Sequence, residues 1–386
     1  MRILIGLTYF QPHKSGLTVY AVRQAQALAA LGHEVTVITS QYDRALPLEE
    51  RVDGVRVVRV PVAFQLSKGV IMPRMPLRVW QLIGESDLIN LHVPQVDAAL
   101  AALLAKLRRK PVVLTYHCDL QMPGGWVNQL AGWVAMVANR ISAGVADAIV
   151  HNTQDFAENS SFLKNYLDKL TVIQPPIVVE PVSEADVARF REKYNIQPGQ
   201  RLVGMLARLA TEKGVEYLVQ AMPKVIQAVP NVRTLFGGEY QQVFGEEAYR
   251  RRLLPMIKDL GDRWTFLGLI SEKEKTVFYQ LCDVLVLPSI NSTESFGMVQ
   301  VEAMTCGTPV VATDLPGVRQ PVRSTGMGAI VPMKDAAALA EAVIQILDSP
   351  DVISPDKVES LQKYYAPEAI GKAYEALFKS LVGMNG

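Results

Sequence analysis

The chain has few cysteines and no long apolar segment, and both absences restrict its expected cellular location. Cys118, Cys282 and Cys306 are far apart and form no C-x-x-C pair. We therefore expect reduced thiols in a cytoplasmic protein. No apolar run approaches the roughly 18 residues of a membrane-spanning helix, and the first residues read as a strand rather than a signal peptide. We expect a soluble protein that at most lies on the cytoplasmic face of a membrane.

An excess of charge of one sign is also missing. The formal net charge is +1 over 386 residues, with a pI near 7.7, so the balance gives no support for a nucleic-acid partner. The length is sufficient for two domains of ordinary size, each with its own core.

Two kinds of cofactor motif are absent. The sequence contains no D-x-D pair and no His/Cys/Asp cluster at metal-ligand spacing, so we expect no metal. The loop from Thr8 to Gly16, after the first predicted strand, lacks the G-x-G-x-x-G pattern of dinucleotide sites. We therefore predict that the protein has no cofactor.

Hydrophobic runs alternate with helical patterns along the chain, which predicts stacked βαβ units. The strands expected in the first half are 2–7, 34–39, 88–91, 112–115, 148–151 and 170–173. Those expected in the second half are 201–207, 234–237, 264–267, 284–288, 309–312 and 329–331. Pro175, Pro176 and Pro181 interrupt the pattern, so we place the domain boundary between residues 178 and 179. The expected fold is α/β, with two Rossmann-like doubly wound domains whose ligands lie at strand carboxyl ends across a cleft.

The segment 294–314, ESFGMVQVEAMTCGTPVVATD, carries the strongest functional signal. A glycine ahead of a helical run leaves backbone amides unpaired where the helix dipole favours an anion such as a diphosphate. Glu294 and Glu302 stand eight positions apart, a little over two helical turns, and carboxylates accept hydrogen bonds from sugar hydroxyls. A capped surface helix with two solvated glutamates is the alternative for the bare pair.

Two cations follow the first strand of the second half. Arg208 and Lys213 stand five residues apart in the loop after residue 207, where they would stabilise negative charge on a departing nucleoside diphosphate. The alternative is that both are solvated loop cations.

These motifs resemble the retaining glycosyltransferases of family 4, which have the two-domain GT-B fold. The segment 294–302 is similar to the E-x7-E motif of that family, and Arg208 to Gly214 is similar to its R-x4-K-G motif. The resemblance implies that Glu294 contacts the donor sugar and that Glu302 holds the ribose. It also implies that the backbone amides of Phe296, Gly297, Met298 and Val299 bind the sugar and the diphosphate.

The resemblance also assigns roles outside the two motifs. It places His117, at the end of a buried strand, beside the reacting sugar, with Asp119 a weaker candidate in the same loop; a satisfied structural histidine is the alternative. Backbone groups around Ile270 are expected to read the nucleobase, although a plain strand-end turn would look the same. In the family, a glycine pair in the loop after the first strand approaches the donor phosphate. This chain keeps the second glycine as Gly16 and has Ser15 in place of the first. The family commonly has a glutamate where Gln320 stands.

The resemblance further implies that a C-terminal helix crosses back to the first domain. The expected domains are therefore 1–178 with 367–386, and 179–366.

A lipid acceptor is suggested by one predicted helix and the cations that precede it. One face of that helix carries Trp126, Leu130, Trp133 and Val137. The preceding basic cluster consists of Lys106, Arg108, Arg109 and Lys110. An interfacial aromatic helix with nearby cations suits peripheral contact of the first domain with an anionic membrane. The alternative is an apolar stripe packed on the sheet.

The resulting hypothesis is a retaining, metal-independent transferase that moves a hexosyl group from a UDP- or GDP-sugar to an acceptor hydroxyl, with a lipid or a cell-envelope glycan as candidate acceptors. Two alternatives remain: a nucleotide-sugar epimerase, and a non-catalytic protein that binds sugar nucleotides. The sequence does not fix the nucleobase, the sugar, the acceptor or the oligomeric state.

Overall fold

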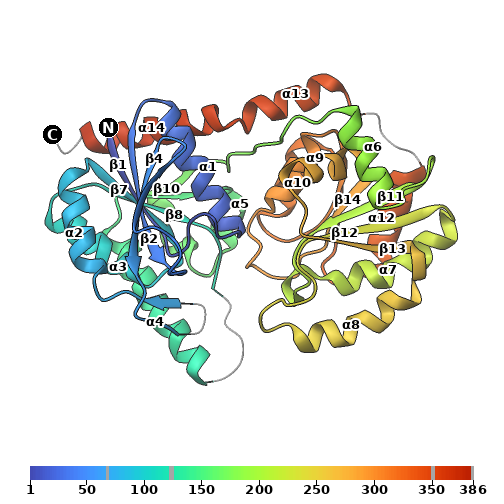
Figure 1. The fold of residues 1–386 in the computed structure, drawn as a ribbon, viewed down its shortest axis with the longest axis horizontal. Coiled ribbons are helices and arrows are strands. Elements are labelled where there is room, and N and C mark those ends of the chain that lie inside the picture. Colours follow the sequence, from blue (N-terminus) through green and yellow to red (C-terminus); the bar gives the residue numbers. More distant parts are fainter. Residues whose placement is uncertain (67–68, 121–125, 349–352, 384–386) are drawn as a thin grey trace. The chain divides into compact units, whose positions relative to one another are not determined.

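The computed structural model describes residues 1–66, 69–120, 126–348 and 353–383. The chain divides into two compact units, Met1–Pro176 with Tyr364–Gly386, and Ile177–Lys363. These divisions fall two or three residues before the expected boundaries at 178/179 and 366/367. Each unit consists of a twisted sheet with helices on both faces (Figure 1).

The first unit is built on an eight-stranded sheet. Its order, from one edge to the other, is β10 (Leu170–Val172), β9 (Ala148–His151), β8 (Val112–Tyr116), β7 (Leu88–Val93), β1 (Arg2–Gly6), β2 (Glu34–Gln41), β4 (Val55–Pro61) and β3 (Glu49–Val52). All neighbours pair in parallel except β3 and β4. The chain winds outward from β1 in both directions, so its switch point lies between β1 and β7.

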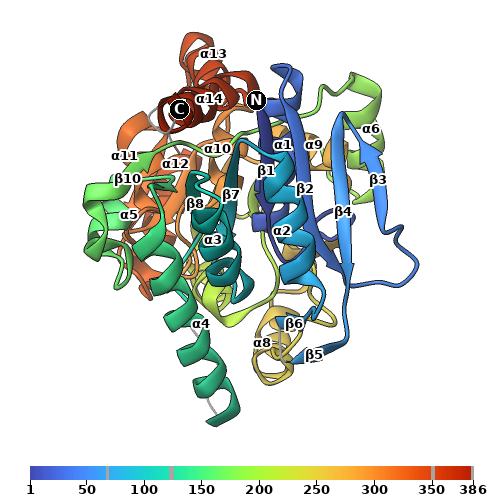
Figure 2. The same cartoon turned by 90° about the vertical axis from the view of Figure 1, so that its left-hand side faces the viewer.

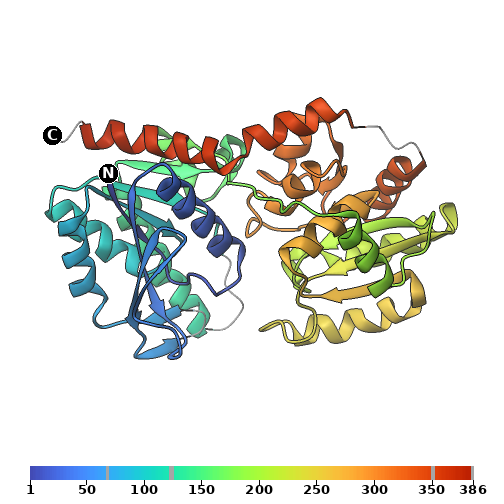
Figure 3. The ribbon, with the colours of Figure 1, turned by 45° about the horizontal axis from the view of Figure 1, so that its top comes forward.

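Helices cover both faces of this sheet. They are α1 (Gly16–Ala30), α2 (Met75–Glu85), α3 (Asp97–Leu107), α4 (Trp126–Val145), α5 (Gln154–Asn159) and α14 (Pro367–Gly383). Short 3-10 turns follow α5 at Leu163–Asn165 and Leu167–Lys169. Helices α2, α3 and α4 lie side by side on one face (Figure 2). Helices α1 and α14 pack together on the other (Figure 3).

The predicted C-terminal helix that returns to the first unit is confirmed as α14, and its contacts with α1 explain why it packs there. The hydroxyl of Tyr374 on α14 lies 2.8 Å from that of Tyr20 on α1, and both rings are buried. Where Gly371 faces α1, a Cβ atom would lie 3.2 Å from the Cβ of Ala27. The lack of a side chain at Gly371 therefore lets the two helices approach closely.

The hairpin formed by β3 and β4 was missed, although its turn has a strong signal. Asp53 and Gly54 connect Val52 to Val55, and both central residues have positive φ, 49° and 80°. Asp-Gly is a preferred sequence for a two-residue hairpin turn because both positions need that conformation. A second hairpin, β5 (Phe64–Leu66) with β6 (Gly69–Ile71), was also missed.

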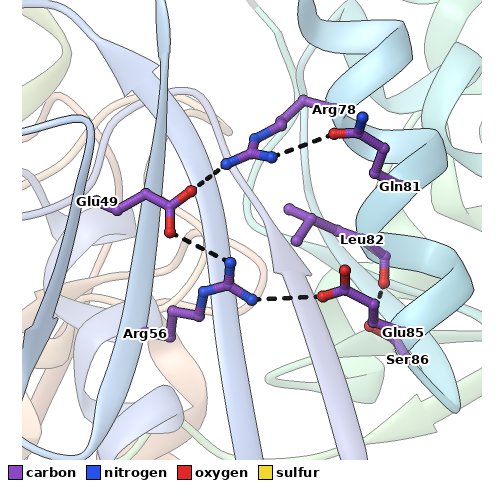
Figure 4. A network of polar contacts seen from close by, with 7 residues as sticks. All are labelled: Glu49, Arg56, Arg78, Gln81, Leu82, Glu85 and Ser86. Atoms are coloured by element: carbon purple, nitrogen blue, oxygen red, sulfur yellow. Dashed lines mark hydrogen bonds and ion pairs between the residues drawn. The ribbon is translucent and has the colours of Figure 1, made fainter.

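Charged side chains join the first hairpin to α2 (Figure 4). Arg56 on β4 bonds Glu49 on β3 at 3.2 Å and Glu85 on α2 at 3.4 Å. Glu49 also pairs with Arg78 on α2. Exposed ion pairs contribute little individually, so we regard this network as fixing the position of the edge hairpin rather than as a main source of stability.

The second unit has a six-stranded parallel sheet. Its order is β13 (Trp264–Gly268), β12 (Val232–Gly237), β11 (Arg201–Leu206), β14 (Val284–Leu287), β15 (Val310–Thr313) and β16 (Gly328–Val331). In chain order this is 3-2-1-4-5-6, the Rossmann arrangement with its switch point between β11 and β14. The expected strands of this unit are present, with ends that shift by one or two residues.

The helices of the second unit pack two apolar cores, one on each face of the sheet. One core includes side chains of α7 (Val215–Ala228), α8 (Glu247–Asp259) and α12 (Ala336–Asp348). The other includes side chains of α6 (Glu184–Lys193), α9 (Glu272–Leu281), α10 (Met298–Met304), α11 (Arg319–Thr325) and α13 (Pro355–Tyr364). Within the described residues of both units, no helix has the length and apolar character needed to cross a membrane.

Candidate functional site

Most of the predicted donor residues of the second unit follow β11 or β14, the two strands at the switch point. Lys213 ends a 3-10 turn, Thr211–Lys213, that follows β11. Its ammonium lies 2.6 Å from the Glu294 carboxylate, which follows β14. Only 20% of the Lys213 side chain and 15% of the Glu294 side chain are exposed. The fold thus joins the two predicted motifs by a partly buried ion pair.

Gly214 allows this close approach of the two loops. It has φ 62°, and a Cβ atom there would collide with the carbonyl oxygen of Pro288. The backbone of the 3-10 turn is also attached to the second loop, because the amide of Ile290 donates to the carbonyl of Glu212 at 3.0 Å. A larger residue at position 214 would separate Lys213 from Glu294.

Arg208 lies earlier in the same loop and has a different partner. Its guanidinium contacts Glu212 at 2.9 Å, and half of its side chain is exposed. Both predicted cations are therefore paired with carboxylates, and Arg208 is the more accessible of the two. Charge on an approaching diphosphate would compete with Glu212 for this guanidinium.

The loop after Glu294 is held in a conformation that only glycine suits. Gly297 has φ 77°, and a Cβ atom there would overlap the side chain of Leu287. Gln300, buried on α10, donates to the carbonyl oxygens of Phe296 and Val318, the latter at 2.9 Å. The backbone of Phe296 and Gly297 is thereby fixed immediately before Met298 and Val299, which begin the seven-residue helix α10.

Glu302 has partners other than those of the Lys213–Glu294 pair, and residues of α9 hold its carboxylate. Its carboxylate accepts a hydrogen bond from the Tyr279 hydroxyl at 2.8 Å and lies 3.4 Å from the Lys275 ammonium. The residue is 3% exposed. The sequence assigned the two glutamates to different parts of the donor, and the tertiary structure gives each a separate set of partners.

Ile270 lies in the turn that connects β13 to α9. Its side chain is half-buried and lies near Gly237 at the end of β12. The next residue, Ser271, caps α9, the helix that supplies Lys275 and Tyr279. The turn of Ile270 and the surroundings of Glu302 are therefore connected through one helix.

In the first unit, His117 follows β8 and meets a second histidine. Its Nε2 atom lies 2.8 Å from Nδ1 of His92 on β7. Burial lowers the pKa of His117, and the neighbouring His92 lowers it further. His117 is therefore a neutral imidazole with a specific partner.

Asp119, the weaker candidate, is engaged in holding the structure together. Its carboxylate accepts hydrogen bonds from the hydroxyls of Tyr116 and Ser160, at 2.8 and 2.5 Å, and from the backbone amide of Ser161 at 3.1 Å. These bonds tie the loop that carries His117 to the segment after α5. We interpret Asp119 as the anchor of that loop.

Gly16 is the first residue of α1, and Ser15 is its N-cap. The Ser15 hydroxyl accepts a hydrogen bond from the amide of Thr18 at 3.2 Å. A serine in the first position of the expected glycine pair therefore has a local structural role, since it satisfies an amide of the first helical turn.

The structure describes two of the four side chains on the predicted aromatic face of α4. The side chains of Trp126 and Leu130 fall outside the described residues. Trp133 is 59% exposed, while Val137 is half-buried. Within the basic cluster, Lys106 pairs with Asp147 at 2.5 Å and Arg108 stacks on the Trp80 ring.

The predictions missed several residues that contact predicted site residues directly, among them His92, Lys275 and Tyr279. For His92 a signal was available, because polar residues alternate with apolar ones in Leu88–Val93. That alternation indicates a polar sheet face. Lys275 and Tyr279 carry no comparable pattern. Among the described residues, no group of three His, Cys, Asp or Glu side chains is arranged to hold a metal.

Both units have the Rossmann-like architecture of the GT-B class of glycosyltransferases. The sequence profile of the glycosyl transferases group 1 matches residues 186–366, and that of the glycosyl transferase 4-like domain matches residues 15–176. Together these profiles span most of the chain. The chain belongs to the glycosyltransferases of family 4, and it is an enzyme of that class.

Individual relatives agree with this assignment. The chain is 26% identical to the phosphatidyl-myo-inositol mannosyltransferase of Mycobacterium leprae, over 90% of this chain and 87% of that protein. Its fold is similar to that of sucrose-phosphate synthase from Thermosynechococcus elongatus, with a TM-score of 0.78, 23% identity and 99% coverage of both chains. It is also similar to the Anabaena protein HepE in complex with UDP-glucose, with a TM-score of 0.77, 21% identity, and coverage of 98% and 100%.

Proposed function

We propose that this glycosyltransferase moves a hexosyl group from a nucleoside diphosphate sugar to an acceptor hydroxyl with retention of anomeric configuration and without a metal ion. The ion pair between Lys213 and Glu294 at the switch point of the second unit carries the proposal. It joins a cation suited to a diphosphate to a carboxylate suited to sugar hydroxyls. The UDP-glucose complex of the structurally similar HepE supports a nucleotide-sugar donor.

The donor is held by the second unit in this proposal. Arg208 and Lys213 neutralise the diphosphate. These two side chains take the place of a divalent cation. The amides of Phe296 to Val299 contribute further hydrogen bonds, and Glu294 accepts from the sugar hydroxyls. Binding of the diphosphate draws Lys213 and Arg208 partly away from Glu294 and Glu212, so both carboxylates become available as the donor arrives.

Glu302 and Ile270 are assigned to the nucleoside end. Glu302 accepts hydrogen bonds from the ribose hydroxyls, and the Tyr279 hydroxyl fixes the orientation of its carboxylate. Backbone groups around Ile270 contact the nucleobase.

The reaction is a substitution on one face of the sugar. The bond from the anomeric carbon to the diphosphate oxygen breaks, and the bond to the acceptor oxygen forms on the same face. The acceptor proton passes to an oxygen of the leaving diphosphate. Arg208 and Lys213 stabilise the negative charge that develops there, while His117 and Gly16 of the first unit contact the reacting sugar and the donor phosphate.

Two successive experiments test the donor, the stereochemistry and the metal dependence. A thermal-shift panel of UDP- and GDP-sugars selects the donor, since a ligand that binds the folded state raises the melting temperature. The enzyme is then incubated with that donor and candidate acceptors in EDTA, and the anomeric protons are followed by NMR. We expect transfer with an unchanged anomeric configuration. Inversion, or strict dependence on added Mg²⁺ or Mn²⁺, would contradict the mechanism.

We also infer that the acceptor is a lipid and that the first unit contacts the membrane which contains it. The mannosyltransferase of M. leprae is named for a phosphatidylinositol acceptor, which supports this choice. Helix α3 has only two charged residues, Asp97 and Lys106, yet Leu103 and Leu107 are 44% and 72% exposed. Trp133 is exposed on the neighbouring helix α4. Exposed apolar side chains on adjacent helices suit an interfacial contact.

Replacing Trp133 and Leu107 together by serine should weaken binding to vesicles that contain anionic phospholipid, because both substitutions remove exposed apolar area. Cosedimentation with the vesicles measures this. Phe244→Ser is the matched control, since Phe244 is 72% exposed on the second unit. The membrane contact is wrong if the wild-type enzyme and the double variant sediment equally.

A further inference from the structure

The sheet of the first unit carries a row of polar side chains on one face. His92 on β7 is in register with Thr115 on β8. Side chains alternate between faces along a strand, so Asn90 lies on the same face as His92. The amide of His117 bonds the carbonyl of Val93 at 2.9 Å and so extends the pairing by one residue. His117 therefore shares this face with Thr115.

His92 and His117 form a close pair within this row. Nδ1 of His92 lies 2.8 Å from Nε2 of His117, and the ring planes differ by only 17°, with their centroids 5.1 Å apart. The ring of Tyr20 packs edge-on against both imidazoles. His92 is 1% exposed, whereas His117 is partly exposed. The buried histidine thus stands directly behind the accessible one.

Both rings are neutral, and this limits the possible hydrogen positions. Burial lowers the pKa of His92 to about 3, and the pKa of His117 is lowered in the same direction. A neutral imidazole has one N–H donor and one lone-pair acceptor. Either His92 donates from Nδ1 to His117, or His117 donates from Nε2 to His92.

The surroundings of His92 favour the first arrangement. Within the described chain, Nε2 of His92 has no hydrogen-bond partner. If His117 were the donor, His92 would carry its hydrogen on that atom and bury an unpaired N–H. Buried backbone N–H groups without partners are rarer than under-satisfied acceptors, and we extend that asymmetry to the imidazole.

His151 on β9, the strand on the other side of β8 from β7, shows the same arrangement. Its Nδ1 lies 2.8 Å from the carbonyl oxygen of Tyr116. A carbonyl oxygen can only accept, so His151 carries its hydrogen on Nδ1. Its Nε2 is also a buried atom without a protein partner in the described chain. This unit therefore already tolerates an unpaired imidazole acceptor.

We propose that His92 is a positioning residue that donates from Nδ1 to Nε2 of His117 and thereby keeps the hydrogen of His117 on its own Nδ1. His117 is then a neutral hydrogen-bond donor of fixed orientation. This role rests on the proposed function, in which His117 contacts the reacting sugar, because a fixed N–H suits an oxygen of the sugar or of the leaving group.

Nitrogen NMR of ¹⁵N-histidine-labelled protein tests the tautomer without substrate. We expect wild-type His117 to carry its hydrogen on Nδ1. In His92→Asn the shorter side chain reaches the place of Nδ1 and its NH₂ can still donate, so the His117 tautomer should persist. His92→Phe removes the donor and should give a mixture of tautomers. His151→Phe, which removes another buried imidazole, is the matched control and should leave the His117 tautomer unchanged.

Turnover provides the second measurement. His92→Phe should lower kcat by about 10- to 100-fold, the range known for removal of a hydrogen-bonded partner that orients a metal-binding histidine, with little change in the KM for the donor. His92→Asn should recover most of this loss. Wild-type His117 with its hydrogen on Nε2, or a tautomer unchanged in His92→Phe, would overturn the proposal.

The tautomer measurement stays informative if the His92→Phe variant does not fold or if the wild-type enzyme shows no turnover. If His92→Phe does not fold, the tautomers in the wild type and in His92→Asn decide. If no donor is turned over by the wild-type enzyme, the proposed function is wrong, whereas the tautomer of His117 is still determined.

Discussion

Replacing Lys213 with methionine is expected to lower kcat by about 100- to 1000-fold, the loss typical of removing one preorganised group that stabilises developing charge. The ammonium lies at the switch point of the second unit, 2.6 Å from Glu294. Its loss removes a fixed positive charge from the proposed diphosphate position and leaves that carboxylate unpaired. Steady-state transfer at saturating donor measures the effect.

A matched control exists in the same unit. Lys224 pairs with Glu341 at 2.7 Å, but half or more of each side chain is exposed. Lys224→Met removes the same type of residue and one ion pair, and exposed pairs contribute about 0–1 kcal/mol to stability. We expect wild-type turnover in this control. Equal turnover in Lys213→Met and Lys224→Met would contradict the role of Lys213.

Replacing Glu294 with alanine is expected to abolish detectable transfer while the protein remains folded. The carboxylate is the proposed acceptor for the sugar hydroxyls, and it is also the partner that orients Lys213. A site built to accept a hydrogen bond loses selectivity and rate together when the acceptor is removed. Transfer assays and a thermal melt on the same sample separate lost function from lost folding.

Two further variants refine this test. Glu294→Gln keeps the shape and one acceptor oxygen, so we expect it to retain more activity than Glu294→Ala. The double variant Lys213→Met, Glu294→Gln should lose less than the sum of the two single losses in free energy, because residues in direct contact are coupled. Glu341→Ala serves as the surface control. Wild-type turnover in Glu294→Ala would refute the assignment.

The fold could be predicted in outline because local patterns specify it. Short apolar runs between helical segments indicated the central strands, and the structure contains them with small shifts at their ends. The β3–β4 hairpin was missed although Asp53-Gly54 marks its turn. The charged residues of these strands interrupted the apolar pattern on which the prediction relied.

The candidate site was only partly predictable, because its motifs are local and its contacts are not. Arg208, Lys213 and Glu294 could be selected from spacing and position after strands. Nothing in the sequence indicates that Glu302 pairs with Tyr279, or that Ser160 donates to Asp119. Those pairings depend on which helix or loop lies beside each carboxylate.

By itself the sequence determined the class of enzyme, the alternation of strands and helices, and the short motifs that carry the proposed chemistry, because each depends on residues close together in the chain. Tertiary structure alone decided that Lys213 meets Glu294 across 81 positions and that His92 stands behind His117. In both units strand order brings together loops that are far apart in sequence. Side-chain spacing along one strand cannot reveal which strand lies next to it.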